Sequence, residues 1–267
     1  MTSLEPAASE NKGTLAVVWA SLRILTGLWG AAISSFVPLT AFEQSVAVWP
    51  PATLGRTWIA RVLLAPWVRW DVHSYLKIIS QGYRLTDGTT QFHPLFPWLA
   101  AALSWITGQP LLSLILLSSL AGLLLLFVFE RLACLDWNEE SARASALLLL
   151  FSPFAFVLFV PYTEGLFLLW AVLCLLEGRR QHWWRAGFAG LLATLTRQQG
   201  IFLFVPLAWE MWEASKPDLR SLLKNWRMWG ALGLIPLGWT LWLVYRALIL
   251  QDLDVDLSTT QIGRAHV

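Results

Sequence analysis

Long apolar runs alternate with short polar segments along most of the chain. A helix that spans a bilayer needs about 20 mainly apolar residues, and residues 110–129 form the cleanest such run. Residues 24–42 carry no charge and follow Lys12 and Arg23. This run is too long for a signal-peptide core and lacks a small-residue cleavage pattern, so we expect a retained first helix. The other apolar runs cover residues 144–161, 165–177, 186–212 and 228–250.

The composition indicates that these runs lie in a bilayer. Of 267 residues, 57% are hydrophobic and 13% are charged, whereas a soluble domain carries about 25% charged residues. Many of the 18 tryptophans flank apolar runs, as aromatic anchors at a membrane interface do. The net charge of +2 is too small to suggest nucleic acid, and two cysteines imply no disulfide framework. We expect a multi-pass protein of a prokaryotic plasma membrane or, in a eukaryote, of the endoplasmic reticulum.

Basic residues collect in cytoplasmic loops and so orient the spans. Placing three basic groups inside makes the first helix run outward and leaves residues 43–109 as one long external segment. Residues 186–212 must then leave and return as a tight hairpin, bent near residues 196–200. The three groups are Arg131 with Arg143, then Arg179, Arg180 and Arg185, then Lys216, Arg220, Lys224 and Arg227.

The apolar stretch 94–107 lies inside the external segment and is too short for a full span, so we expect a re-entrant or interfacial helix. The predicted fold class is all-α: a polytopic membrane helix bundle with a long first external loop that contains juxtamembrane or re-entrant helices. The predicted organisation is a disordered polar N-terminus (1–14), a transmembrane domain (15–250) and a polar tail (251–267) that is consistent with truncation.

The predicted topology gathers four polar clusters on one membrane face. Ionisable residues at or inside apolar segments are costly, which makes them candidates for function. The clusters are Arg69-Trp70-Asp71-Val72-His73 with Gly82-Tyr83, then Phe92-His93-Pro94, then Tyr162-Thr163-Glu164, then Thr196-Arg197-Gln198-Gln199.

Each cluster also has a purely structural interpretation. Asp71 can pair with Arg69, and Glu164 can form an ion pair with Arg197 between helices. Other members suit ordinary hydrogen bonding or aromatic anchoring at the interface, namely His73, His93, Tyr83 and Tyr162. The sequence has no glycine-rich phosphate loop, no cysteine cluster with zinc spacing and no His-Glu-x-x-His, so no metal ligands are assigned.

At these clusters the chain reads RWDVHSYLKIISQGY (69–83), QFHPLFPWL (91–99), SPFAFVLFVPYTEGLF (152–167) and AGLLATLTRQQG (189–200). In this order and approximate spacing the segments resemble the PIG-V-like mannosyltransferases, which are GPI-anchor enzymes and their prokaryotic relatives with the GT-C membrane fold. Two segments depart from the family pattern. Its Phe-Phe-Pro reads Phe92-His93-Pro94, and its Thr-Arg-Ser-like signature reads Thr196-Arg197-Gln198, which leaves the substrate open. Family members are also considerably longer.

The resemblance implies transfer of a sugar, usually mannose, from a polyprenyl- or dolichyl-phosphate donor on the external or lumenal face. Asp71 matches the acidic residue of the first external loop, and it would take the proton of the acceptor hydroxyl in an inverting displacement. No cofactor is required, a divalent metal is not indicated, and the acceptor is an unknown lipid, glycan or protein. The residues implied in substrate binding are Trp70, His73, Tyr83, His93, Tyr162, Glu164, Arg197 and Gln198.

Two other classes of protein remain open. A transporter or flippase for a lipid-linked sugar or small anion would use the same charges as a pathway between inverted repeats near the midplane. The sequence shows no such repeat, and the long external segment argues against this class. An inactive fragment of an enzyme would have the same sequence features as an active one.

Overall fold

The computed structural model describes residues 5–36, 64–85, 87–215 and 225–250, and all regular elements in these ranges are helical, which confirms the predicted all-α membrane bundle. The predicted tail 251–267 lies outside the described residues. The α-helices are α1 (Glu5–Phe36), α4 (Asp71–Gln81), α5 (Leu95–Thr107), α6 (Pro110–Ala133), α7 (Glu139–Phe151), α8 (Glu164–Arg179), α9 (Trp183–Thr196), α10 (Phe204–Ala214) and α12 (Trp226–Leu248). Short 3₁₀ helices are η1 (Ala65–Trp67), η2 (Thr89–Gln91), η3 (Ala155–Leu158) and η4 (Gln198–Leu203).

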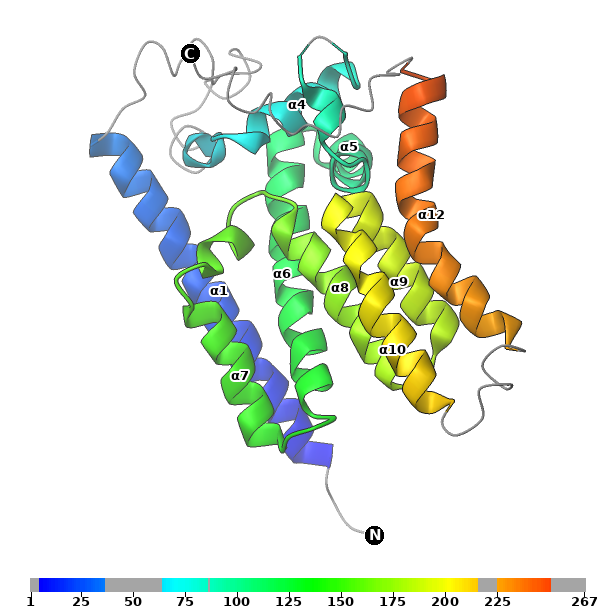
Figure 1. Ribbon diagram of the computed structural model, residues 1–267. Coiled ribbons are helices and arrows are strands. Elements are labelled where there is room, and N and C mark those ends of the chain that lie inside the picture. The colour runs from blue at the N-terminus through cyan, green and yellow to red at the C-terminus, as the bar shows by residue number, and fades with distance from the viewer. Residues whose placement is uncertain (1–4, 37–63, 86, 216–224, 251–267) are drawn as a thin grey trace.

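Three of the described helices are long and apolar enough to cross a membrane. They comprise Gly13–Ile33 within α1, Pro110–Ala133 and Trp226–Leu248, with 21, 24 and 23 residues. At a rise of about 1.5 Å per residue, each covers a hydrocarbon core of roughly 30 Å. Figure 1 shows α4 and α5 together at one end of the bundle, which we name the α4–α5 end.

The first span differs from the predicted range 24–42. Helix α1 begins at Glu5, and its membrane-length part is Gly13–Ile33. The described part of the segment 1–14 is therefore helical rather than disordered. The residues Glu5–Lys12 explain this difference, because proline suits the first turn of a helix and alanine, glutamate and lysine favour its interior.

Arg23 consequently lies in the middle of a membrane-length helix. The sequence interpretation placed it before the span, because a charge inside a bilayer is costly. The structure accommodates the guanidinium through a hydrogen bond from Arg23 Nε to Ser119 Oγ at 2.9 Å. The guanidinium carbon also lies 4.4 Å from the ring centroid of Trp67, at cation–π distance.

The predicted span over residues 144–161 is wrong. Helix α7 has 13 residues and ends at Phe151, so it is too short to cross a bilayer. Ser152 precedes Pro153, and the residue before a proline is disfavoured in helical conformation. Ser152 is accordingly extended, with φ −67° and ψ 149°, and the chain then approaches α8 through the short η3 helix.

The predicted hairpin over residues 186–212 is confirmed. Helix α9 runs toward the α4–α5 end, η4 turns the chain after Thr196, and α10 returns (Figure 1). The arms have 14 and 11 residues. They are about 21 and 16 Å long at a rise of 1.5 Å per residue, so neither spans a bilayer. Thr196 and Gly200 are buried at the turn, as irregular backbone at membrane depth must be.

Helix α5 coincides with the stretch 94–107 that the sequence predicts not to span the membrane. It has 13 residues and is too short to cross a bilayer. Pro94 caps its beginning, and Gly108 ends it in the left-handed region with φ 67°, a conformation that glycine adopts without a steric penalty. In Figure 1, α5 is viewed nearly along its axis while α6 runs up the page, so α5 lies across the bundle. The predicted re-entrant or interfacial placement agrees with this arrangement.

Helix α8 begins about two turns below the beginning of α6. A Cβ atom on Gly165 would lie 3.6 Å from the Ser118 carbonyl oxygen and 3.7 Å from the Gly122 nitrogen. Ser118 is eight residues beyond Pro110, which corresponds to about 12 Å along α6. The first turn of α8 therefore lies well below the α4–α5 end.

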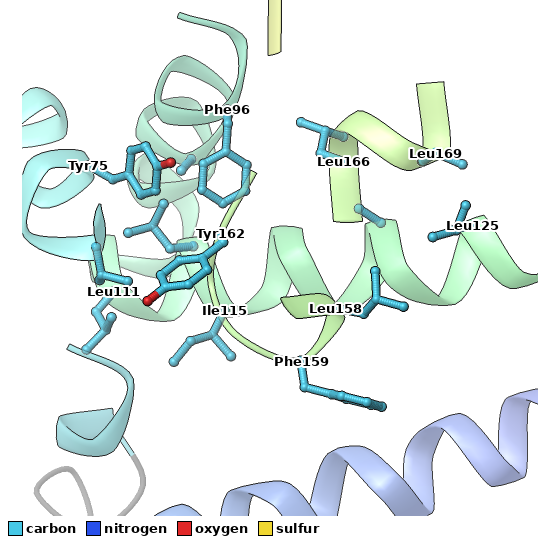
Figure 2. Packing of buried hydrophobic residues seen from close by; sticks show 14 of the residues in the cluster. Tyr75, Phe96, Leu111, Ile115, Leu125, Leu158, Phe159, Tyr162, Leu166 and Leu169 are labelled. Carbon is cyan, nitrogen blue, oxygen red and sulfur yellow. The ribbon is translucent and has the colours of Figure 1, made fainter. Parts of the chain in front are cut away.

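Two apolar clusters hold the bundle together. One joins α1, α4, α5, α6 and α8, and Figure 2 shows Tyr75, Phe96 and Tyr162 of this cluster close together. The other joins α8, α9, α10 and α12. Helices α9 and α12 approach so closely that a Cβ atom on Gly187 would overlap the carbonyl group of Ala231. This contact fixes the helix that leads to Arg197 against α12.

Candidate active site

The site is built around an ion pair between the first residue of α8 and the residue that follows α9. Arg197 Nη1 donates to Glu164 Oε1 at 2.5 Å and to the Thr163 hydroxyl oxygen at 3.0 Å. Both charged side chains are about 30% exposed, at 31% for Arg197 and 28% for Glu164. The predicted approach of Glu164 and Arg197 is therefore present in the structure.

The helix ends favour the charges that they carry. Glu164 occupies the first turn of α8, where the helix dipole stabilises a negative charge. Arg197 caps the C-terminus of α9 in an extended conformation, where a positive charge is favourable. The pair is thus held by backbone placement as well as by its mutual attraction.

Asp71 is the first residue of α4, and the charges of Glu164 and Arg197 act on its carboxyl group. Burial of part of its carboxyl group raises the pKa of Asp71, the nearby Glu164 carboxylate raises this pKa further, and Arg197 lowers it in part. Asp71 keeps an exposed surface, which an acceptor could reach. The three charged residues that the sequence singled out thus influence one another, although α4, α8 and α9 supply one each.

Two neutral residues connect these charges: Tyr75, which the sequence interpretation missed, and Thr163, which it placed in a polar cluster without a role. Tyr75 lies one helical turn after Asp71 and is 2% exposed, and its side chain is hydrogen-bonded to Thr163. Thr163 in turn accepts the hydrogen bond from Arg197. The i, i+4 spacing of Asp71 and Tyr75 could have revealed the shared helix face, whereas the contact with Thr163 depends on the tertiary fold.

Tyr162 belongs to the same group and is 9% exposed. Burial raises the pKa of its phenol, and the Asp71 and Glu164 carboxylates add to the effect. Its ring lies beside Phe96 in Figure 2, in the apolar cluster that supports α4. Tyr162 therefore lies close enough to Asp71 and Glu164 for both carboxylates to act on its phenol.

One oxygen of the ion pair has no partner among the described residues. Glu164 Oε2 is buried from solvent and accepts no hydrogen bond there. A buried polar atom without a partner costs about 1–3 kcal/mol. This oxygen therefore keeps an unused acceptor position next to the ion pair.

A second group of predicted residues lies against α12. The ring centroid of Tyr83 is 4.9 Å from that of Trp242, and that of His93 is 6.0 Å from the same indole. His93 also bonds the backbone of Thr194, three residues before Arg197. Burial lowers the pKa of His93 to about 4, and the positive charges of Arg246 and Arg197 lower it as well, whereas the bond to Thr194 raises it. The ring is therefore neutral at physiological pH. No feature of the sequence indicated that α12 packs against Tyr83 and His93.

The remaining predicted residues do not join the ion pair. His73 lies two residues beyond Asp71, on roughly the opposite face of α4. Burial lowers its pKa to about 4, and its charged neighbours are Lys77 and Arg69. Trp70 is 74% exposed and has a positive φ of 45°, a strained conformation for a bulky residue. Gln198 is exposed at the beginning of η4.

The opposite end of the bundle has a different character. Two cavities there have volumes of about 290 and 260 Å³, and none of the predicted site residues lines either of them. Arg185 lines the first, and the Arg179–Asp136 pair borders the second. Within the described ranges, no group of three or more His, Cys, Asp or Glu side chains is arranged to hold a metal ion.

Comparison with known proteins gives one distant relationship. The chain is 28% identical over 158 residues to GPI mannosyltransferase 2 of Schizosaccharomyces pombe. The alignment covers 56% of the chain and 33% of that protein, so the chain spans about a third of the length of the curated relative. No family model matches the chain. No solved structure matches it either. The chain is therefore distantly similar to a GPI mannosyltransferase over part of its length.

Proposed function

We propose that the chain carries the acceptor-activating part of a membrane glycosyltransferase that moves mannose from a polyprenyl- or dolichyl-phosphate donor to a hydroxyl group. The observation that carries the proposal is the cluster of Asp71, Glu164 and Arg197 beneath the α4–α5 end of a membrane bundle. The distant similarity to GPI mannosyltransferase 2 and the resemblance to the PIG-V-like family support the choice of sugar.

The reaction is a single displacement at the anomeric carbon. The acceptor oxygen forms a bond to this carbon as the bond to the phosphate oxygen breaks, which inverts the configuration. The acceptor proton passes to the Asp71 carboxylate, and the lipid phosphate leaves with the bonding electrons. The raised pKa of Asp71 makes it a better base than an ordinary aspartate, as long as it is deprotonated.

Arg197 binds the phosphate of the donor, and Glu164 binds its sugar. Arg197 uses Nη1 for both of its recorded hydrogen bonds, which leaves Nη2 and Nε to bind the phosphate oxygens. Charge-assisted bonds of this kind stabilise the negative charge that develops on the leaving group. The unpartnered Glu164 Oε2 accepts a hydrogen bond from a sugar hydroxyl and so orients the ring.

A transfer assay tests the proposal. Membranes that contain the protein, and control membranes without it, are supplied with polyprenyl-phosphate [³H]mannose or with nucleotide-linked [³H]mannose after endogenous lipid donor has been depleted. We expect protein-dependent transfer from the lipid-phosphate donor alone. Arg197→Gln should strongly reduce the transfer, whereas Arg179→Gln, at an exposed ion pair of the opposite end, should retain it.

Two results would contradict the proposal. Transfer from the nucleotide-linked sugar in the absence of a lipid donor would assign a different substrate class. Movement of intact polyprenyl-phosphate mannose across a sealed vesicle, without cleavage of the glycosidic bond, would favour a flippase.

A further inference from the structure

Arg23 is a cation in the middle of a membrane-length helix, on the side of α1 that faces the protein. On the same side, Leu15 is fully buried and Trp19 is 4% exposed. The charge is therefore turned toward α6 and η1 rather than toward lipid. An ionisable residue inside a span is costly and marks a candidate functional site.

The guanidinium of Arg23 is only partly satisfied by the described residues. Its recorded hydrogen bond runs from Nε to Ser119 Oγ at 2.9 Å, and one face covers the Trp67 ring at 4.4 Å. Within the described parts of the chain, no carboxylate lies within 4.0 Å of it. None of the described residues accepts a hydrogen bond from Nη1 or Nη2, so among them these four N–H groups are available to an anion.

Other arginines of the bundle show the contrast. Arg143 lies 3.5 Å from a carboxylate oxygen of Glu130, and Arg197 lies 2.5 Å from one of Glu164. Arg179 lies 2.6 Å from one of Asp136. Each of these guanidinium groups has a carboxylate partner. Arg23, at the middle of its span, has as described partners the hydroxyl group of Ser119 and the indole ring of Trp67.

The groups around Arg23 match a phosphate that is attached to a long hydrocarbon chain. A guanidinium presents a planar fork that binds two phosphate oxygens, and it is more weakly hydrated than an ammonium. The Ser119 hydroxyl accepts from Nε and keeps its own hydrogen to donate. The outward face of α1 next to Arg23 carries four large apolar side chains whose exposed fractions are between 58% and 69%, namely Ile24, Leu25, Leu28 and Trp29.

We propose that Arg23, Ser119 and Trp67 form a binding site for the phosphate group of a membrane lipid, with the hydrocarbon chain along the outer face of α1. The Ser119 side chain bonds Arg23 of α1, whereas a Cβ atom on Gly165 of α8 would lie 3.6 Å from the carbonyl oxygen of the adjacent Ser118, so α1 and α8 are both neighbours of α6 at this level. The inference concerns binding alone and does not depend on the proposed transfer reaction.

Lipid binding to the purified protein in phosphatidylcholine nanodiscs tests the site. Three probes are titrated: undecaprenyl phosphate, phosphatidic acid and uncharged undecaprenol. The variant Arg23→Met keeps the length and apolar stem of the side chain and removes the charge. The matched control is Arg179→Met, which removes a more exposed guanidinium at the opposite end of the bundle.

We expect the wild type to bind at least one phosphate-bearing probe about tenfold more tightly than undecaprenol, as one or two charge-assisted hydrogen bonds would give. Arg23→Met should lose this difference, and Arg179→Met should keep it. Loss for undecaprenyl phosphate alone assigns the site to an isoprenoid phosphate, and loss for phosphatidic acid alone assigns it to a phospholipid.

Equal binding of undecaprenol and both phosphate probes by the wild type would overturn the proposal without any variant. Unchanged phosphate preference in Arg23→Met would also overturn it. Should the methionine variant fail to fold, Arg23→Lys provides the second variant: it keeps the charge but loses the fork, and a phosphate preference equal to that of the wild type would contradict a site built on the guanidinium geometry.

Discussion

Arg197 and Glu164 meet at 2.5 Å although 33 positions separate them in the chain. Helices α8 and α9 run antiparallel between them, and the pair joins the two helices at the end opposite their connecting turn (Figure 1). The same guanidinium nitrogen bonds Thr163. The ion pair therefore links the beginning of α8 to the turn that follows α9.

A double-mutant cycle should show that this pair is energetically coupled. We expect Glu164→Gln and Arg197→Gln to have an interaction free energy of about 1–3 kcal/mol, because the pair is half-buried and charge-assisted. The measurement is the free energy of unfolding in mild detergent. The control pair is Arg179 and Asp136, with side-chain exposures of 37% and 53%, for which less than about 1 kcal/mol is expected. Equal coupling in the two cycles would argue against a special role for the Glu164–Arg197 pair.

The pH dependence of transfer should report the charges around Asp71. A general base works when it is deprotonated, so the rate falls as the pH drops through the raised pKa of Asp71. Glu164→Gln removes a charge that raises this pKa, and the acidic limb of the rate profile should move to lower pH. Arg197→Gln removes a charge that lowers it, and the limb should move to higher pH. Shifts in the same direction would contradict the arrangement.

The raised pKa of Asp71 should also make the free energy of unfolding depend on pH. A carboxyl group whose pKa is raised on folding stabilises the folded state at low pH, and this contribution is lost as the pH rises through the folded pKa. Relative to Asp71→Asn, the wild type should therefore become less stable as the pH rises above the ordinary value of 3.8. Unfolding measured across this range provides the check.

Thr163 should contribute to transfer through Arg197 and Tyr75. Thr163→Val keeps the shape of the side chain but removes the hydroxyl that both partners use. We expect turnover to fall about tenfold or more, since a hydrogen bond to a charged group contributes about 1.5–3 kcal/mol. The matched control is Thr196→Val, which loses only a bond to Leu192 within its own helix. Equal effects of the two substitutions would assign Thr163 a local structural role.

Cysteine labelling should place α5 on one side of the membrane. Gly88 and Gln109 flank the stretch 94–107 and lie within the segment 43–109 that the sequence predicts to be external. Cysteines at both positions should therefore react with an impermeant reagent from the same side. The native Cys134 is exposed beyond the far end of α6, and it should react from the other side. Opposite accessibility of the two introduced cysteines would show that α5 crosses the bilayer.

Charge placement made several elements predictable from the sequence. The basic residues before and after residues 186–212 required a hairpin, and η4 provides its turn. The same reasoning misplaced the first span, because Arg23 was treated as a boundary when its cost is offset by Ser119 and Trp67. A contact between distant segments leaves no trace in the hydropathy of either one.

The charged residues of the candidate site were predictable from the sequence, whereas Tyr75 and Trp242 were not. Asp71, Glu164 and Arg197 stand out because ionisable groups are rare near apolar segments. Tyr75 and Trp242 are ordinary aromatic residues in the sequence, and their roles come from packing against segments far away in the chain. The separation of His73 from this group follows from the helix geometry of α4.

The central claim is that Asp71 takes the acceptor proton while Glu164 and Arg197 hold the donor. Asp71→Asn keeps the shape of the side chain and removes most of its basicity. The decisive measurement is the turnover of this variant with a polyprenyl-phosphate sugar, made together with donor affinity and thermal stability. We expect turnover to fall by about 10²–10⁴-fold, with little change in donor affinity and no loss of stability. A folded Asp71→Asn protein that transfers sugar at the parental rate would contradict the account.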